Sequence, residues 1–180
     1  MRATAIAFHV ADDSGALALV EFAAYSTFVD EDWQYEQLLG HFKAQAQQRC
    51  IIVWDANDGG GNYRVEVRHG ITELLGYRSV VAAIRVTAGA LHLASYTALT
   101  MAAQYADQCV PSRDETHWRV PLENADYRVR IVQLFDPDLP DELPRDAPHF
   151  VLEVEAGAGD PTQNVAWFSA LPEAGRPCCS

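Results

Sequence analysis

The chain has 180 residues, of which 13 are Lys or Arg and 25 are Asp or Glu, so its formal net charge is −12. Apolar residues make up 49% of the chain, which excludes a disordered acidic tail and predicts a folded protein. The strong negative charge argues against binding to nucleic acid or anionic membranes, because no basic stripe reverses the repulsion. We expect a single domain over residues 1–172 and a flexible C-terminal tail over residues 173–180.

Strands are predicted over most of the chain, with glycine-containing turns between them. Three pairs of neighbouring runs, each joined by a short turn, fit β-hairpins. Further strands are predicted near residues 118–120, 127–135 and 150–155. About eight to ten strands favour a mainly β fold, an antiparallel β-sandwich. The three predicted hairpins are 4–10 with 17–22 around a turn at 12–15, 49–55 with 62–69 around the loop 56–61, and 80–87 with 91–94 around residues 88–89.

One segment, residues 32–48, has helical periodicity. Apolar residues recur there at a spacing of three or four, for example at Trp33, Leu38 and Phe42. The acids at positions 30–32 precede this run, where carboxylates cap a helix and favour the positive end of its dipole. We therefore predict that the β-sandwich carries one α-helix, at about residues 32–48.

An acidic, proline-rich segment interrupts the strand pattern at residues 136–148. Its four prolines keep it extended and out of a sheet interior. Its five acids have no capping role, so the segment is either a solvated loop or a pre-extended surface that docks on a basic partner. These acids are Asp136, Asp138, Asp141, Glu142 and Asp146.

The sequence contains no recognisable constellation for catalysis or metal binding. The six histidines show no His-x-His or His-Glu-x-x-His pattern, and the four cysteines lack Cys-x-x-Cys spacing. The glycines at 59–61 are not followed by Gly-Lys-Ser/Thr, so a tight turn is favoured over a phosphate loop. We expect no metal, no cofactor and no enzymatic activity. Cys50 is expected to be an inert core thiol, and Cys178 and Cys179 lie in the predicted tail.

The sequence also favours a cytoplasmic location. No apolar run approaches the roughly 18–20 residues that a membrane helix needs. The apolar stretch at the N-terminus ends at His9 and is followed by Asp12 and Asp13, which is unlike a secretory signal. We expect neither a membrane nor a nucleic acid among the partners.

Three consecutive segments carry a family resemblance. Residues 80–86 fit an inward-facing strand, residues 91–95 a short leucine-rich strand that ends in serine, and residues 118–129 a strand pair with a proline and a tyrosine. Over residues 80–135 this succession resembles the competence-type inhibitors of DNA-uptake nucleases. The resemblance implies an all-β inhibitor that blocks a nuclease. Such a role is similar to that of immunity proteins, which guard bacteria against secreted toxin domains.

Two functional hypotheses follow. The first is a non-enzymatic immunity protein or nuclease inhibitor that occludes the active site of a basic toxin or nuclease domain. Its expected contacts are the five acids of the proline-rich segment, with Trp33 and Tyr35 as aromatic anchors, although Trp33 fits equally well in the core. The second is a small-ligand or peptide-binding β-sandwich in which His92, Tyr96 and Trp118 line a concave sheet face. An enzyme of unrecognised type and a structural subunit stay open as further alternatives.

Overall fold

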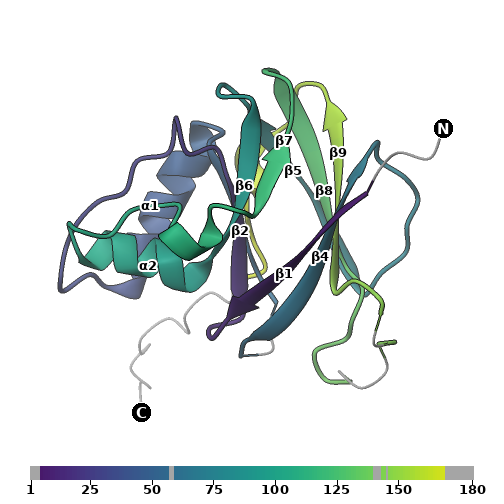
Figure 1. The fold of residues 1–180 in the computed structure, drawn as a ribbon, viewed down its shortest axis with the longest axis horizontal. Helices are drawn as coiled ribbons and strands as arrows, with labels where there is room; N and C mark the ends of the chain where they lie inside the picture. The colour runs from purple at the N-terminus through teal and green to yellow at the C-terminus, as the bar shows by residue number, and fades with distance from the viewer. Residues whose placement is uncertain (1–4, 57–58, 140–142, 145, 169–180) are drawn as a thin grey trace, which may run out of the picture.

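The structure, a computed structural model, describes residues 5–56, 59–139, 143–144 and 146–168 (Figure 1). Within these residues, ten strands form two sheets, and helices lie in the connections between strands. The elements are β1 (Ile6–Asp12), β2 (Ala16–Val20), α1 (Tyr35–Gln47), β3 (Ile51–Asp55), β4 (Gly61–His69), β5 (Arg78–Arg85), β6 (Ala90–Ser95), α2 (Tyr96–Gln104), the 3₁₀ helix η1 (Arg113–Glu115), β7 (Arg119–Pro121), β8 (Asp126–Gln133), β9 (Phe150–Ala156), the 3₁₀ helix η3 (Pro161–Gln163) and β10 (Val165–Ala166).

Each sheet has five strands. Sheet A has the order β1-β4-β9-β8-β5, and sheet B has the order β10-β3-β2-β6-β7. Pairing is antiparallel except between β4 and β9 and between β3 and β10, which run parallel. The prediction of a mainly β fold is therefore confirmed, and two of its strand pairs are parallel where antiparallel pairing was predicted.

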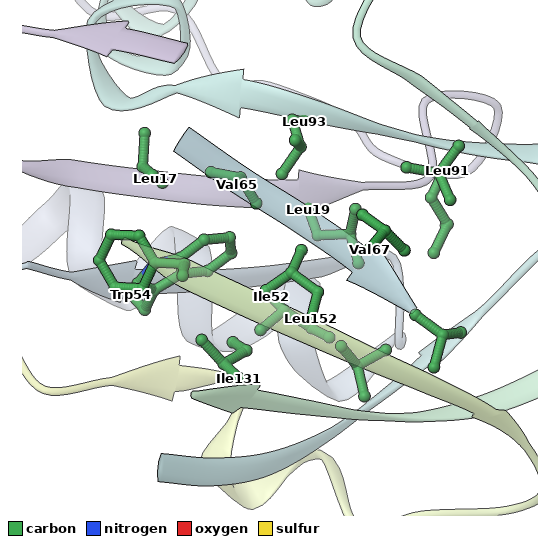
Figure 2. Close-up of a cluster of buried hydrophobic side chains, with 14 of the residues drawn as sticks. Leu17, Leu19, Ile52, Trp54, Val65, Val67, Leu91, Leu93, Ile131 and Leu152 are labelled. Atoms are coloured by element: carbon green, nitrogen blue, oxygen red, sulfur yellow. The ribbon is translucent and has the colours of Figure 1, made fainter. Parts of the chain in front are cut away.

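Apolar side chains from both sheets form one buried cluster. Side chains alternate across each strand, so every second residue points to the same face of its sheet. Figure 2 shows this cluster with Leu17, Leu19, Leu91 and Leu93 from sheet B and Val65, Val67, Ile131 and Leu152 from sheet A. Trp54 is fully buried here, and its ring meets that of Phe150 at a centroid distance of 5.9 Å.

Sheet B is apolar on its other face as well, and both α-helices cover that face (Figure 1). All five residues of β2 are buried. Leu17 and Leu19 enter the first cluster, and Ala18 and Val20 enter a second cluster under the helices. The second cluster contains Ala18, Val20, Ile51, Val53 and Ala94 from the sheet, and Leu38, Phe42, Ala46, Leu99 and Ala103 from the helices.

The prediction of one helix is wrong, because α2 is a second one. Ser95 caps it: the serine side chain accepts a hydrogen bond from the backbone N–H of Ala98 at 3.1 Å. The predicted helix at residues 32–48 corresponds to α1, which begins at Tyr35 after the cap residue Gln34.

Among the described residues, no helix combines the length and apolar character that crossing a membrane requires.

The three predicted hairpins are also wrong, although most of their strands exist. In each case the turn carries the chain from one sheet to the other, so the two strands face each other across the core and do not pair. Gly15, Gly60 and Gly89 have φ angles of 76°, 106° and 73° in these turns. Gly60 has a second constraint, because a Cβ there would lie 2.4 Å from the backbone oxygen of Asp13 in the neighbouring turn. Tight glycine turns serve both kinds of connection, which is why the pattern did not distinguish them.

Asn164 joins the edges of the two sheets. Its side-chain Oδ1 accepts from the N–H of Ala83 on β5 at 2.9 Å, and its Nδ2 donates to the carbonyl of the same residue at 2.7 Å. Nδ2 also donates to the carbonyl of Ile51, the first residue of β3 in the other sheet, at 2.8 Å. The side chain is fully buried. One amide therefore satisfies backbone groups from both sheets that would otherwise be buried without partners.

We predict that Asn164→Ala lowers the free energy of unfolding by about 3 kcal/mol, because it removes three buried hydrogen bonds and leaves their backbone partners unpaired. The matched control is Asn124→Ala, since Asn124 is exposed and accepts one hydrogen bond, from the N–H of Gly89. Urea unfolding followed by tryptophan fluorescence measures both variants. Equal losses of unfolding free energy in the two variants would contradict the role of Asn164 in joining the two sheets.

Candidate functional site

The structure separates the residues predicted to contact a partner. The connection between β8 and β9 lies on the opposite side of the molecule from α1 and α2 (Figure 1). Asp138 and Asp146 are exposed on this connection, and Asp136 is half-buried and accepts from the N–H of Asp138 at 2.9 Å. Asp141 and Glu142 lie outside the described residues. A role for these acids in binding stays a prediction.

The two predicted aromatic anchors lie at the start of α1. Trp33 is half-buried and packs against the cluster under the helices, which supports its alternative assignment to the core. Tyr35 is half-buried, and burial, followed by the charges of Asp55 and Glu36, raises its pKa. The helix α1 that follows these aromatics and the connection between β8 and β9 lie on opposite sides of the molecule (Figure 1).

The residues of the alternative ligand-binding hypothesis do not share a face. The ring of His92 lies against that of Phe22 at a centroid distance of 4.9 Å. Tyr96 is the first residue of α2 and meets Phe42 at 6.3 Å. Trp118 belongs to the cluster between the sheets. Of the three predicted residues, Trp118 is the one that lines the cavity described next.

A cavity of about 310 Å³ lies beside α2, between this helix and the connection that leads to β7. Apolar side chains line one part of it, and hydroxyl, amide and carboxyl groups line the rest. Ser95 ends β6 and Trp118 directly precedes β7. These strands are neighbours in sheet B, so the sheet holds both sides of the cavity. The lining residues are Ser95, Thr97, Ala98, Met101, Gln108, Cys109, Ser112, Asp114, Glu115 and Trp118.

Glu115 is the buried acid of this cavity, with 5% of its surface exposed. Its Oε1 accepts hydrogen bonds from the N–H of Ser95 at 3.1 Å and from the Ser95 hydroxyl. Its Oε2 has no hydrogen-bond partner among the described residues. Burial raises the pKa of Glu115, and the nearby charge of Asp12 adds to this rise. The hydrogen bonds from Ser95 and the nearby side chain of Ser112, which makes no hydrogen bond of regular geometry with Oε2, oppose it.

Asp12 is a second buried acid at the start of α2. Its Oδ1 accepts from the backbone N–H and the hydroxyl of Thr97 at 3.0 and 3.1 Å. Its Oδ2 accepts from the N–H of Ser14 at 2.8 Å, so β1, its turn and the helix are held together. Carboxylates at this position also favour the positive end of the helix dipole. No sequence motif indicates the roles of Asp12 and Glu115, although Ser95 before an apolar run is a recognisable helix start.

The surroundings of the cavity are acidic and partly apolar. An adjoining cavity of about 440 Å³ adds Asp107 and shares Asp114 with the first. Three large apolar side chains near the end of α2 are exposed, namely Val29 (52%), Met101 (38%) and Tyr105 (40%). The segment that carries Asp30, Glu31 and Asp32 packs against the same end of α2, where the N–H of Asp30 donates to the carbonyl of Ala103 at 2.9 Å and Gln104 donates to the carbonyl of Glu31 at 3.4 Å.

Charge is distributed unevenly over the molecule. The strands of sheet A carry six arginines and five acids, and most of them pair on the outer face of that sheet. The segments 22–48 and 96–117, which contain the helices and which we call the helix side, carry seven acids and two basic residues. Asp107, Asp114 and Glu31 form no ion pair with any described residue. Ion pairs that join described residues include Arg49–Asp126, Arg68–Glu66, Arg85–Asp126, Arg128–Glu155 and Arg130–Glu153.

Among the described residues, no group of three or more His, Cys, Asp or Glu side chains is placed to hold a metal ion. Cys50 is buried, as predicted, and burial raises its pKa to about 11. Cys109 is an exposed free thiol beside the cavity. The two cysteines of the predicted tail lie outside the described residues.

Comparison with known proteins shows likeness in structure at low sequence identity. One similar structure is described as "Crocagin biosynthetic gene J", with a TM-score of 0.58 and 12% identity over 88% of this chain and 100% of that chain. Another is ComJ, an inhibitor of the DNA degrading activity of NucA, from Bacillus subtilis, with a TM-score of 0.48 and 11% identity over 84% of this chain and 96% of that chain. No family model matches the chain, and no curated protein matches it at a significant level.

The first likeness shows that the two chains share a fold. The second protein is described as a nuclease inhibitor, and the resemblance stated from residues 80–135 is to proteins of that type.

We predict that Glu115→Gln raises the melting temperature or leaves it unchanged at pH 8, because it removes a charge that burial disfavours. The raised pKa means that the folded chain protonates Glu115 at a higher pH than the unfolded chain does. Ionised Glu115 therefore costs stability at high pH, and this cost disappears as the pH falls through the folded pKa. The advantage of the variant in melting temperature should shrink as the pH is lowered from 8, as thermal unfolding at a series of pH values would show.

The matched control is Glu123→Gln, which removes the charge of an exposed acid. Its melting temperature should stay close to that of the wild type across the same pH range. A pH-independent loss of stability in Glu115→Gln would contradict the prediction.

Proposed function

We propose that this chain is a non-enzymatic protein inhibitor, of the nuclease-inhibitor or toxin-immunity type, that binds a basic partner with its helix side. The observation that carries the proposal is the uneven distribution of charge. Four of the six arginines in the strands of sheet A form ion pairs with acids of the same sheet, whereas the acids of the helix side have few basic neighbours. The long-range field of an unpaired acidic face steers a basic protein to that face.

The partner's chemistry follows from what a nuclease must do. A nuclease binds the phosphates of its substrate, so its active site carries arginine and lysine side chains. An acidic face that covers such a cleft competes with the substrate for the same charges. The exposed side chains of Val29, Met101 and Tyr105 would supply the apolar centre of the interface, and the acids its charged rim. As an immunity protein the chain would act in the cytoplasm of the producing bacterium.

The proline-rich segment stays a second, competing contact surface. Of its described acids, Asp138 and Asp146 are exposed, and Asp136 accepts a hydrogen bond from the N–H of Asp138. Because this segment and the helix side lie on opposite sides of the molecule, a compact partner would cover one of them. The cavity beside α2 keeps a small-ligand-binding module as the alternative function.

Two matched charge reversals test the proposal. Asp107→Lys with Asp114→Lys changes the helix side, and Asp138→Lys with Asp146→Lys changes the proline-rich segment by the same charge; all four residues are exposed. The partner is captured from the producing bacterium with the wild-type chain, and association is measured by surface plasmon resonance at rising salt. We expect the helix-side variant to associate at least about tenfold more slowly at low salt, and the control variant to stay within about threefold of the wild type.

Salt should also slow the association of the wild type, since the Debye length falls to about 8 Å at physiological ionic strength. If the control variant instead shows the larger loss, the proline-rich segment is the contact surface. If both variants bind as the wild type does, the proposal of an electrostatically guided inhibitor is wrong.

A further inference from the structure

The cavity beside α2 contains an acid that the fold does not fully use. Oε1 of Glu115 accepts hydrogen bonds from Ser95, and these bonds place the carboxyl group against the start of α2. Oε2 is buried and has no partner among the described residues. Leaving one carboxylate oxygen without a donor costs stability, because the group has lost its water. A fold under selection for stability alone would place an amide or an apolar side chain at this position.

The remaining lining of the cavity suits one kind of guest. Trp118, Met101 and Ala98 offer apolar and aromatic surface, while Asp114 and Gln108 add oxygen acceptors. An arginine side chain matches this combination: its stem packs on apolar groups, its planar guanidinium stacks on aromatic rings, and its five donors bind carboxylates. The cavity of about 310 Å³ has room for such a side chain. Arg113 is the basic residue nearest to the acids in sequence, and it lines the adjoining cavity and not this one.

We propose that this cavity receives an arginine side chain of the basic partner, with Glu115 as its buried counter-ion. The inference rests on the proposed function and names the group that anchors the partner. Met101 lines the cavity and is also one of the three exposed apolar side chains near the end of α2, with Val29 and Tyr105. An arginine that enters the cavity therefore comes from a protein that covers these side chains. A buried, charge-assisted contact of this kind holds a complex together once it has formed, and thus acts mainly on the dissociation rate.

The first experiment needs no partner. Argininamide is titrated into the isotope-labelled wild-type chain, and NMR follows the Trp118 indole and the Met101 methyl group. We expect saturable shifts of both signals. Citrullinamide, a neutral analogue of the same shape, should give at least tenfold weaker binding. Equal binding of the two probes, or shifts that ignore these two groups, would overturn the inference.

Variants then connect the cavity to the partner. Glu115→Gln should abolish the argininamide shifts and speed dissociation of the captured partner at least tenfold, whereas Glu123→Gln, which removes an exposed charge elsewhere, should leave both unchanged. Gln108→Trp serves as a second variant, since Gln108 is exposed at the cavity and a larger side chain there would block it. It should act as Glu115→Gln does.

The outcomes separate the two proposals. If a basic partner binds with salt-dependent rates and Glu115→Gln dissociates no faster, the arginine site is wrong and the inhibitor proposal stands. If argininamide binds at Trp118 and Met101 but the helix-side charge reversal leaves partner association unchanged, the proposed function is wrong and the cavity binds guanidinium compounds independently of it.

Discussion

Sheet B must be covered on both faces, and much of the molecule follows from this constraint. Its central strand β2 is buried at every position, with Leu17 and Leu19 on one side and Ala18 and Val20 on the other. Sheet A covers the first face. The second face needs an apolar cover of its own, and α1 and α2 supply it from two connections within the same sheet. The helices are therefore part of the core, and the cavity arises where α2 and the chain that returns to β7 leave a gap.

The same arrangement decides where charge can be paired. Long side chains on neighbouring strands meet on the outer face of sheet A: Arg128 on β8 pairs with Glu155 on β9, and Arg130 with the buried Glu153. Arg85 and Arg49 hold the pKa of Asp126 below its ordinary value. Ion pairing between neighbouring strands thus neutralises many of the arginines on the outer face of sheet A. The excess of acids is left on the helices and loops, where it is available to a partner.

Local sequence patterns predicted which segments form strands and α1 better than they predicted which strands pair. Alternation in β1 and β4 and the periodicity of Leu38 and Phe42 depend on short-range geometry, so strands and α1 were found within a few residues. Whether two strands pair or face each other depends on the rest of the chain, since both arrangements bury the same alternate residues. The helix α2 was missed because its apolar run is short and directly continues the pattern of β6. Glu115 was missed because its burial depends on Ser95, which is 20 residues away in the chain.

The turns that switch between sheets also bear on how the chain folds. Strands that follow each other closely, such as β1 and β2, find their hydrogen-bonding partners far along the sequence: β1 pairs with β4, and β4 with β9. Few sheet contacts can therefore form early as local hairpins, with β8 and β9 as the nearest approach to one. Proteins dominated by such distant contacts fold slowly, because loop closure must precede the gain from pairing. Within the cell, sheet A can therefore form in full only after β9 has been synthesised, because β9 pairs with both β4 and β8.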